Sequence, residues 1–341
     1  MRSLSRRNLF LGSLAAGAIA GPARAFARAE KSVFMVLWRG ETEVEAGFRS
    51  YFERSNVPLN IVVRSLDRNT ANLEAILDEI NDVKPDLVYS WGTSVTLGIA
   101  GRDPLLMDGP SDFPPQITDR PVVFTMVSQP IKSRIIKRFG LTGRNVTGVS
   151  HLVPIQTQIE AMRAYMPVDR LSVIFTPSET NSVLAVNQLT EIGQRMNVRV
   201  EKFPVPNNLQ GQPDPDSLPQ LVSAAAATGS QFLYLGPDSF IGQYAAQVTG
   251  LANSFRLPSF ASVERMLSAS DALYGLVAPY RKVGEFTAMK VERILFENED
   301  PALIPVEVLP EFAYRIRADI ARDLQIFPRL SLLEYAETIE N

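Results

Sequence analysis

Short apolar runs alternate with amphipathic stretches along the first half of the chain. Over positions 73–80, leucine and isoleucine recur every three or four residues, which predicts a helix with one apolar face. Predominantly apolar runs are typical of strands covered on both faces, and four of them occupy residues 33–38, 59–63, 87–89 and 122–127. Because predicted strands and helices alternate, this half is expected to form a parallel sheet with helices on both faces.

A second series of strands and helices is expected after Ser150. Apolar spacing predicts helices over residues 155–166 and 186–196, and apolar runs predict strands at residues 171–175, 198–203, 232–235 and 273–277. Proline-rich stretches at residues 101–120 and 204–219 are expected to be surface loops. The extended segment Gly143–Ser150 joins the two series and is a candidate hinge. The pattern therefore predicts an α/β protein of two Rossmann-like lobes, each a parallel sheet flanked by helices.

The first 27 residues have the pattern of an export signal. Arg6 and Arg7 precede an apolar stretch at residues 9–20, which is shorter than the roughly 20 residues that cross a bilayer. Small residues around Ala25 and Ala27 suit signal-peptide cleavage. The paired arginines favour twin-arginine export, with an ordinary secretory signal as the alternative. Either route predicts a periplasmic protein whose signal is removed near Ala25 or Ala27.

The amino-acid composition excludes several kinds of chemistry. The 341 residues include no cysteine and one histidine, His151, which excludes disulfides, thiolate catalysis, a lipid-anchoring cysteine and multi-histidine metal sites. A formal net charge of −3 without a basic run argues against a nucleic-acid partner. The glycine motifs of dinucleotide and phosphate loops are absent, as is the serine motif of the nucleophile elbow. We therefore expect no metal or cofactor, and binding of a ligand without catalysis.

Polar residues follow several of the predicted strands, which is where open α/β sheets bind their ligands. Many of them also precede predicted helices, whose free backbone N–H groups can hold a carboxylate. Any single one of these residues could be a helix cap and nothing more. Four or more such turns facing one cleft favour a small-molecule site instead. The candidate positions are Thr93, Ser94, Ser128, Gln129, Asn181, Ser182, Asp238 and Ser239.

One family pattern runs through the chain after the signal. Gly143–Ser150 reads Gly-Arg-Asn-Val-Thr-Gly-Val-Ser and follows a Pro-Val-Val-Phe strand at residues 121–124. Further motifs are Glu179-x-Asn181-Ser182, Pro237-Asp238 and Leu257-Pro-Ser-Phe260. Together these motifs resemble the ABC transporter substrate-binding proteins of the tryptophan/tyrosine-binding type.

The resemblance implies a periplasmic binding protein-like fold of type I, in which two lobes close on one small molecule and deliver it to a permease in the inner membrane. It also implies a hinge of several crossovers, and we expect a monomer. Lobe one is expected to contain residues 30–149 and about 279–300, and lobe two residues 150–278 and about 301–341. Carried over by motif, the ligand-binding residues are Thr93, Ser94, Ser128, Gln129, Ser150, Asn181, Ser182 and Asp238.

The expected ligand is an amino-acid-sized zwitterion or carboxylate with an apolar body. Trp38 and Tyr280 are candidates for aromatic walls, with a place in the core as the alternative. Asp238 could receive an ammonium group. Ser128-Gln129-Pro130 replaces the family's usual Thr/Asp-Asp-Pro and so removes one carboxylate. Two other functions stay open: a ligand-sensing subunit that docks on a membrane receptor, and a periplasmic enzyme exported in folded form.

Overall fold

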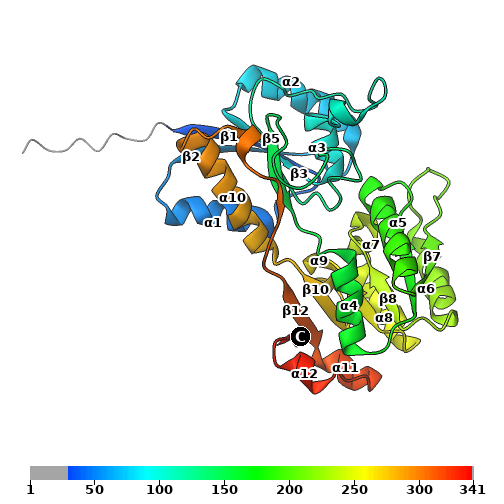
Figure 1. The fold of residues 1–341 in the computed structure, drawn as a ribbon. Helices are drawn as coiled ribbons and strands as arrows, with labels where there is room; N and C mark the ends of the chain where they lie inside the picture. Colours follow the sequence, from blue (N-terminus) through cyan, green and yellow to red (C-terminus); the bar gives the residue numbers. More distant parts are fainter. Residues whose placement is uncertain (1–29, 340–341) are drawn as a thin grey trace, which may run out of the picture.

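The structure is a computed structural model that describes residues 30–339, so the predicted signal lies outside it. Figure 1 shows two lobes joined by a narrow waist. Lobe one contains a six-stranded sheet, all of it parallel, in the order β11-β5-β4-β3-β1-β2. Its strands are β1 (Lys31–Leu37), β2 (Leu59–Ser65), β3 (Leu87–Trp91), β4 (Val122–Thr125), β5 (Val146–Ser150) and β11 (Glu307–Val308).

Lobe two contains a seven-stranded sheet in the order β13-β12-β10-β9-β8-β6-β7. One neighbouring pair, β10 and β12, is antiparallel, and the other pairs are parallel. The strands are β6 (Arg170–Phe175), β7 (Arg199–Pro204), β8 (Phe232–Leu235), β9 (Ser259–Ala261), β10 (Tyr274–Val277), β12 (Ala313–Arg317) and β13 (Glu337–Ile339). The expected fold class of two α/β lobes is thereby confirmed, with the antiparallel β12 as an addition.

Helices cover both faces of each sheet. Those of lobe one are α1 (Glu43–Arg54), α2 (Leu73–Val83), α3 (Thr93–Ala100) and α10 (Tyr280–Phe296). Those of lobe two are α4 (Ile155–Tyr165), α5 (Thr180–Arg195), α6 (Leu218–Ala227), α7 (Ser239–Gln243), α8 (Ala245–Ser254), α9 (Glu264–Ser268), α11 (Ala318–Leu324) and α12 (Leu330–Leu333). Lobe one has a separate apolar core on each face of its sheet, whereas the core of lobe two is one continuous cluster.

The chain passes between the lobes three times, at residues 151–154, 278–279 and 309–312. The third passage differs from the expected boundary near residue 300, because β11 pairs with β5 in the sheet of lobe one. Lys290 on α10 holds this segment through an ion pair of 2.6 Å with Glu307. Val306 is fully buried in the same lobe. The first passage likewise begins after Ser150 rather than within residues 143–150, since β5 extends to that residue.

The helices α1 and α10 cross at very short distance because glycines lie at the crossing. A side chain at Gly47 would place its Cβ 2.1 Å from the carbonyl oxygen of Arg281. At Gly284 the Cβ would lie 1.9 Å from the carbonyl oxygen of Val44. The crossing holds α10 against lobe one, although the residues on either side of it in the sequence come from lobe two and the β11 segment (Figure 1).

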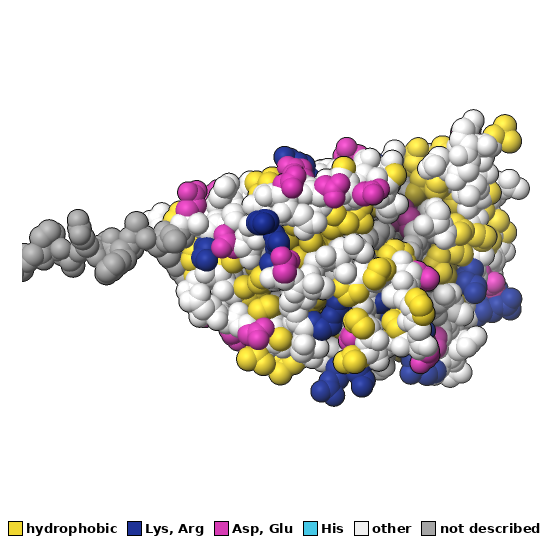
Figure 2. All heavy atoms as spheres, turned by 90° about the horizontal axis from the view of Figure 1, so that it is seen from above, with side chains coloured by type: hydrophobic (Ala, Val, Ile, Leu, Met, Phe, Trp, Pro, Cys, Tyr) yellow, Lys and Arg dark blue, Asp and Glu magenta, His cyan; other side chains and the backbone are white. Residues whose placement is uncertain are grey.

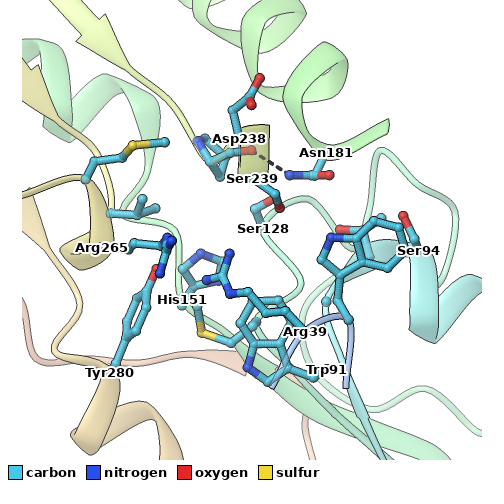
Figure 3. Close-up of a pocket in the computed structure, with 17 residues that line it drawn as sticks. Arg39, Trp91, Ser94, Ser128, His151, Asn181, Asp238, Ser239, Arg265 and Tyr280 are labelled. Carbon is cyan, nitrogen blue, oxygen red and sulfur yellow. Dashed lines mark hydrogen bonds between the residues drawn. The ribbon is translucent and has the colours of Figure 1, made fainter. Parts of the chain in front are cut away.

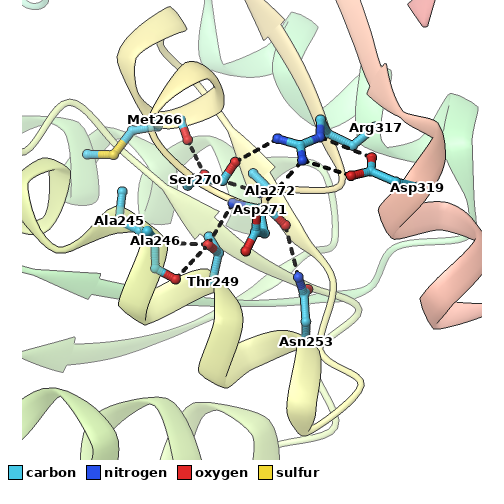
Figure 4. Close-up of polar contacts among 10 residues, drawn as sticks. All are labelled: Ala245, Ala246, Thr249, Asn253, Met266, Ser270, Asp271, Ala272, Arg317 and Asp319. Atoms are coloured by element: carbon cyan, nitrogen blue, oxygen red, sulfur yellow. Dashed lines mark hydrogen bonds and ion pairs between the residues drawn. The ribbon is translucent and has the colours of Figure 1, made fainter. Parts of the chain in front are cut away.

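A polar network ties the C-terminal segment to lobe two (Figure 4). The buried guanidinium of Arg317 at the end of β12 donates to the carbonyl oxygen of Ser270 at 3.0 Å and pairs with Asp319 at 2.8 Å. The backbone N–H of Asp271 donates to Thr249 Oγ1 on α8 at 2.9 Å. Because these bonds fix the turn before β10, they also fix the strand that leads into the second passage.

On the face seen in Figure 2, several Asp and Glu side chains follow one another along the upper edge, whereas Lys and Arg side chains are scattered in small groups. Such a surface offers no extended basic area to a nucleic acid. Within residues 30–339, no helix is both long and apolar enough to span a membrane.

Replacing Gly284 by alanine tests the close helix crossing. The added methyl group overlaps the carbonyl of Val44, so the helices must separate, and we expect a loss of about 1–3 kcal/mol in the free energy of unfolding. Urea unfolding followed by circular dichroism measures this loss. Gly250→Ala on α8, where open space surrounds the glycine, is the matched control and should be neutral or stabilising by up to about 1 kcal/mol. Equal effects of the two changes would contradict the crossing.

Candidate ligand-binding cleft

A cleft lies between the lobes at the waist, and its empty space is about 540 Å³ when the open solvent at its mouth is included. Its walls come from the carboxyl ends of strands in both sheets, since Trp91 ends β3, Trp38 follows β1 and Pro237 follows β8. Figure 3 shows Trp91, Arg39, Tyr280 and other labelled side chains of the lining around one space.

The structure brings together most of the residues expected at the ligand. Helix α3 begins at Thr93 and α10 at Tyr280, so the first turns of both helices face the cleft. Tyr280 is 6% exposed, and its ring packs edge-on against His151 at a centroid distance of 6.2 Å. The expected residues that line the cleft are Trp38, Thr93, Ser94, Ser128, Asn181, Asp238, Ser239 and Tyr280.

Three expected residues do not line the cleft, because each is engaged elsewhere. Ser150 Oγ donates to the carbonyl oxygen of Val127 at 2.8 Å and fixes the end of β5. Ser182 Oγ donates to Asp238 at 2.6 Å, beneath the wall of lobe two. The amide of Gln129 reaches across to the side chain of Gln188 on α5 and joins the two lobes.

Asp238 lines the cleft, but its carboxylate is already saturated. Oδ1 accepts from Thr176 Oγ1 at 3.0 Å and from the N–H of Ile241 at 2.8 Å. Oδ2 accepts from the N–H of Thr176 at 2.7 Å and from Ser182 Oγ. These bonds occupy all four acceptor positions of the carboxylate. The geometry therefore argues against the expected role of Asp238 as receptor of an ammonium group. Asp238 instead holds the turns after the strands of lobe two in place.

A second carboxylate, that of Glu179, lies beside Asp238. Its oxygens accept from the N–H groups of Ser239 and Phe240 at 2.8 Å each, at the start of α7. Burial, together with the charge of Asp238, raises the pKa of Glu179 from 4.5 to about 7. Burial also raises the pKa of Asp238. Glu179 lines an adjoining groove, which also includes Phe113 of the first proline-rich stretch.

Several lining residues were not among the expected ligand-binding residues, and four of them carry polar or charged groups: Arg39, Trp91, His151 and Arg265. The guanidinium of Arg39 lies over the ring of Trp91, 4.8 Å from its centroid. Arg39 and Trp91 stand at strand ends, so the rule that located Trp38 could also have located them. Arg265 lies on α9, a five-residue helix that the apolar pattern does not predict.

The cleft contains buried polar atoms that have no hydrogen-bond partner. Buried polar groups are paired in most proteins, so such atoms call for an explanation. Ser128 is 6% exposed, yet its hydroxyl has no partner. The unpartnered atoms in the cleft are Arg39 Nε, Trp91 Nε1, Thr93 Oγ1, Ser128 Oγ, His151 Nδ1 and Arg265 Nε.

The two titratable rings of the cleft are both neutral at pH 7. Burial, together with the charge of Arg39, lowers the pKa of His151 to about 3. Burial also raises the pKa of Tyr280 to about 12. Over residues 30–339, no three acidic or histidine side chains are grouped closely enough to hold a metal ion.

Two α/β lobes around a polar cleft define a binding protein, and the comparisons with known proteins identify its family. A family model described as ABC transporter substrate binding protein matches residues 59–340. The chain belongs to this family, which confirms the resemblance seen in its sequence motifs.

Individual relatives agree with this assignment. A tyrosine-binding protein of Clostridioides difficile is 26% identical over 226 residues, which are 65% of this chain and 62% of that protein's length. An ABC domain from Streptococcus pneumonia in complex with L-Trp is 21% identical, with a TM-score of 0.74 over 90% of this chain and 99% of that one. A ligand-free, open substrate-binding protein with adhesive properties from Clostridium difficile is 18% identical, with a TM-score of 0.67 over 91% and 99% of the two chains. These two structures support the fold.

The raised pKa of Glu179 predicts a pH dependence of stability. The folded protein holds this proton more tightly than the unfolded chain, so the carboxyl group reduces stability as the pH rises from about 4.5 to about 7. We expect the wild type to lose thermal stability relative to Glu179→Gln, which stays neutral, between about pH 5 and pH 8. Glu160→Gln, an exposed change on α4, is the control. Parallel melting profiles of the wild type and Glu179→Gln would contradict the shift.

Proposed function

We propose that this protein captures a small molecule between its lobes and delivers it to an ABC transporter permease in the inner membrane. The observation that carries the proposal is a cleft between the lobes whose lining, among the described residues, includes six buried polar atoms without hydrogen-bond partners. Leaving a buried polar group unpaired costs about 1–3 kcal/mol, so a ligand that pairs these groups gains free energy from each of them. Family membership supports the transport role.

The ligand in this proposal is a carboxylate or zwitterion of amino-acid size with an apolar body. Trp38, Trp91 and Tyr280 offer aromatic surface, and Arg39 and Arg265 offer positive charge. The names of the relatives support this class, since one protein binds tyrosine and another structure contains L-Trp. The export signal in residues 1–27, the periplasmic location and the monomeric state belong to the same proposal.

The hinge suits a protein that closes on its ligand. Three short connections join the lobes, at residues 151–154, 278–279 and 309–312, and none of them contains a helix or strand. Away from the hinge the lobes meet through side chains, for example between Lys132 and Glu191 at 3.3 Å. Because that ion pair is about half-exposed, it contributes little to the closed arrangement. We infer that the ligand supplies most of the free energy of closure.

Tryptophan fluorescence tests ligand binding directly. The chain has two tryptophans, Trp38 and Trp91, and both line the cleft. A ligand found by native mass spectrometry of the purified protein should change the tryptophan emission and, at 100 times its Kd, stabilise the fold by about 2.7 kcal/mol. Small-angle X-ray scattering should show a smaller radius of gyration with the ligand. If no retained molecule, amino acid or small carboxylate changes any of these quantities, the proposed function is wrong.

A further inference from the structure

We propose that the cleft selects an aromatic carboxylate that lacks an α-ammonium group over the corresponding amino acid. This inference rests on the proposed function and names the chemical class of its ligand. It rests on the side chains of the cleft, which offer more unpartnered hydrogen-bond donors and positive charges than free acceptors and negative charges.

The unpartnered atoms of the cleft favour a ligand rich in acceptors. Arg39 Nε, Arg265 Nε and Trp91 Nε1 can only donate hydrogen bonds. The hydroxyl groups of Thr93 and Ser128 can also donate, as can His151 Nδ1 in one of its neutral tautomers. A carboxylate accepts up to four hydrogen bonds and donates none, which matches this supply.

Neither arginine of the cleft is paired with a carboxylate of the described residues. Within residues 30–339, no ion pair is formed by Arg39 or by Arg265. Elsewhere in lobe two, two arginines of low exposure have carboxylate partners, whereas the partly buried Arg163 and Arg170 donate to backbone carbonyl oxygens. Arg315 pairs with Glu264 at 2.7 Å and with Glu337 at 2.8 Å, and Arg317 pairs with Asp319. The missing anion in the cleft is therefore best supplied by the ligand.

The two guanidinium groups belong to different lobes. Arg39 follows β1 in lobe one, and Arg265 lies on α9 in lobe two. They face the same space in Figure 3, and the charge of Arg265 contributes to lowering the pKa of Arg39, after the larger effect of burial. Two like charges brought together repel each other unless an anion lies between them. A carboxylate between them would join the lobes, whereas an ammonium group would add a third positive charge.

No carboxylate of the cleft is free to receive an ammonium group. Asp238 is the one acidic residue in the lining among the described residues, and its four acceptor positions are occupied. Glu179 faces the adjoining groove and holds the start of α7. Asn181 Oδ1 and the hydroxyl groups offer only neutral acceptors. An α-ammonium group would lose its water without gaining a charged partner.

The remaining surface of the cleft suits an aromatic ring. The rings of Trp38, Trp91 and Tyr280 line it, together with the side chains of Met126, Val263 and Met266. Arg39 covers one face of Trp91, so its guanidinium is oriented before any ligand arrives. A ring attached to a carboxylate by a short alkyl chain would place its apolar part on these side chains and its charge between the arginines.

Isothermal titration calorimetry with matched pairs tests the inference. The pairs are 3-(indol-3-yl)propanoate with L-tryptophan, and 3-(4-hydroxyphenyl)propanoate with L-tyrosine, whose members differ only in the ammonium group. We expect the acid of at least one pair to bind ten times more tightly than its amino acid or better. Arg39→Gln and Arg265→Gln should each weaken that acid at least tenfold, since each removes a charged donor. Arg199→Gln, an exposed change on β7, should leave its affinity unchanged.

The outcomes separate this inference from the proposed function. If an amino acid binds as tightly as its matched acid or more tightly, the selection is wrong and the capture function stands. If neither member of either pair binds, the chemical class of the molecule retained by the purified protein, identified by native mass spectrometry, tests the inference. An aromatic carboxylate without an amine supports the inference, and any other class of molecule overturns it. If no small molecule binds in either assay, the proposed function fails and the inference fails with it. Unchanged melting temperatures of the two arginine variants show that they are folded.

Discussion

The close crossing of α1 and α10 is the contact on which the two-lobed arrangement depends. Gly47 and Gly284 let the helix backbones touch, and this contact holds a late segment of the chain against lobe one. The consequence at the cleft is direct, because α10 begins with Tyr280. The N–H of Tyr280 donates to Glu264 of lobe two at 2.6 Å, and Glu264 also pairs with Arg315 on β12. The crossing in lobe one thus positions both the hinge and one aromatic wall of the site.

The acidic and the basic side chains in and beside the cleft differ in whether the protein pairs them. Asp238 and Glu179 receive six hydrogen bonds between them from backbone and hydroxyl donors, and these bonds make the turns of lobe two rigid. Arg39 and Arg265 form no ion pair with any carboxylate of residues 30–339. The internal bonds of the acids keep the wall in shape without a ligand, so binding costs little reorganisation. The unpaired donors set what kind of molecule can bind.

The sequence allowed much of the fold and part of the site to be predicted. Strands and helices follow from apolar spacing, and the strand-end rule located Trp38 and Thr93 because it depends only on topology. The rule could not separate Ser128, which faces the cleft, from Ser182, which turns toward Asp238 beneath it. Whether a polar side chain is already paired depends on neighbours distant in sequence. The strand β11 was not predicted either, because two residues are too few to show an apolar pattern and the strand is held by Lys290, a residue of another element.

The placement of the two unpaired arginines links binding to closure. Each lobe brings one guanidinium to the cleft, so an empty cleft keeps the lobes apart to the extent that the two charges repel. The half-exposed ion pair of Lys132 and Glu191, which joins the lobes elsewhere, contributes little against this repulsion. An anion between the guanidinium groups converts that repulsion into two attractions, and it does so only when the lobes are close. Its affinity for the closed arrangement therefore exceeds its affinity for the open one, which is the difference that any ligand needs to shift the population. The same two guanidinium groups would then both select an anionic ligand and favour closure of the lobes when it binds.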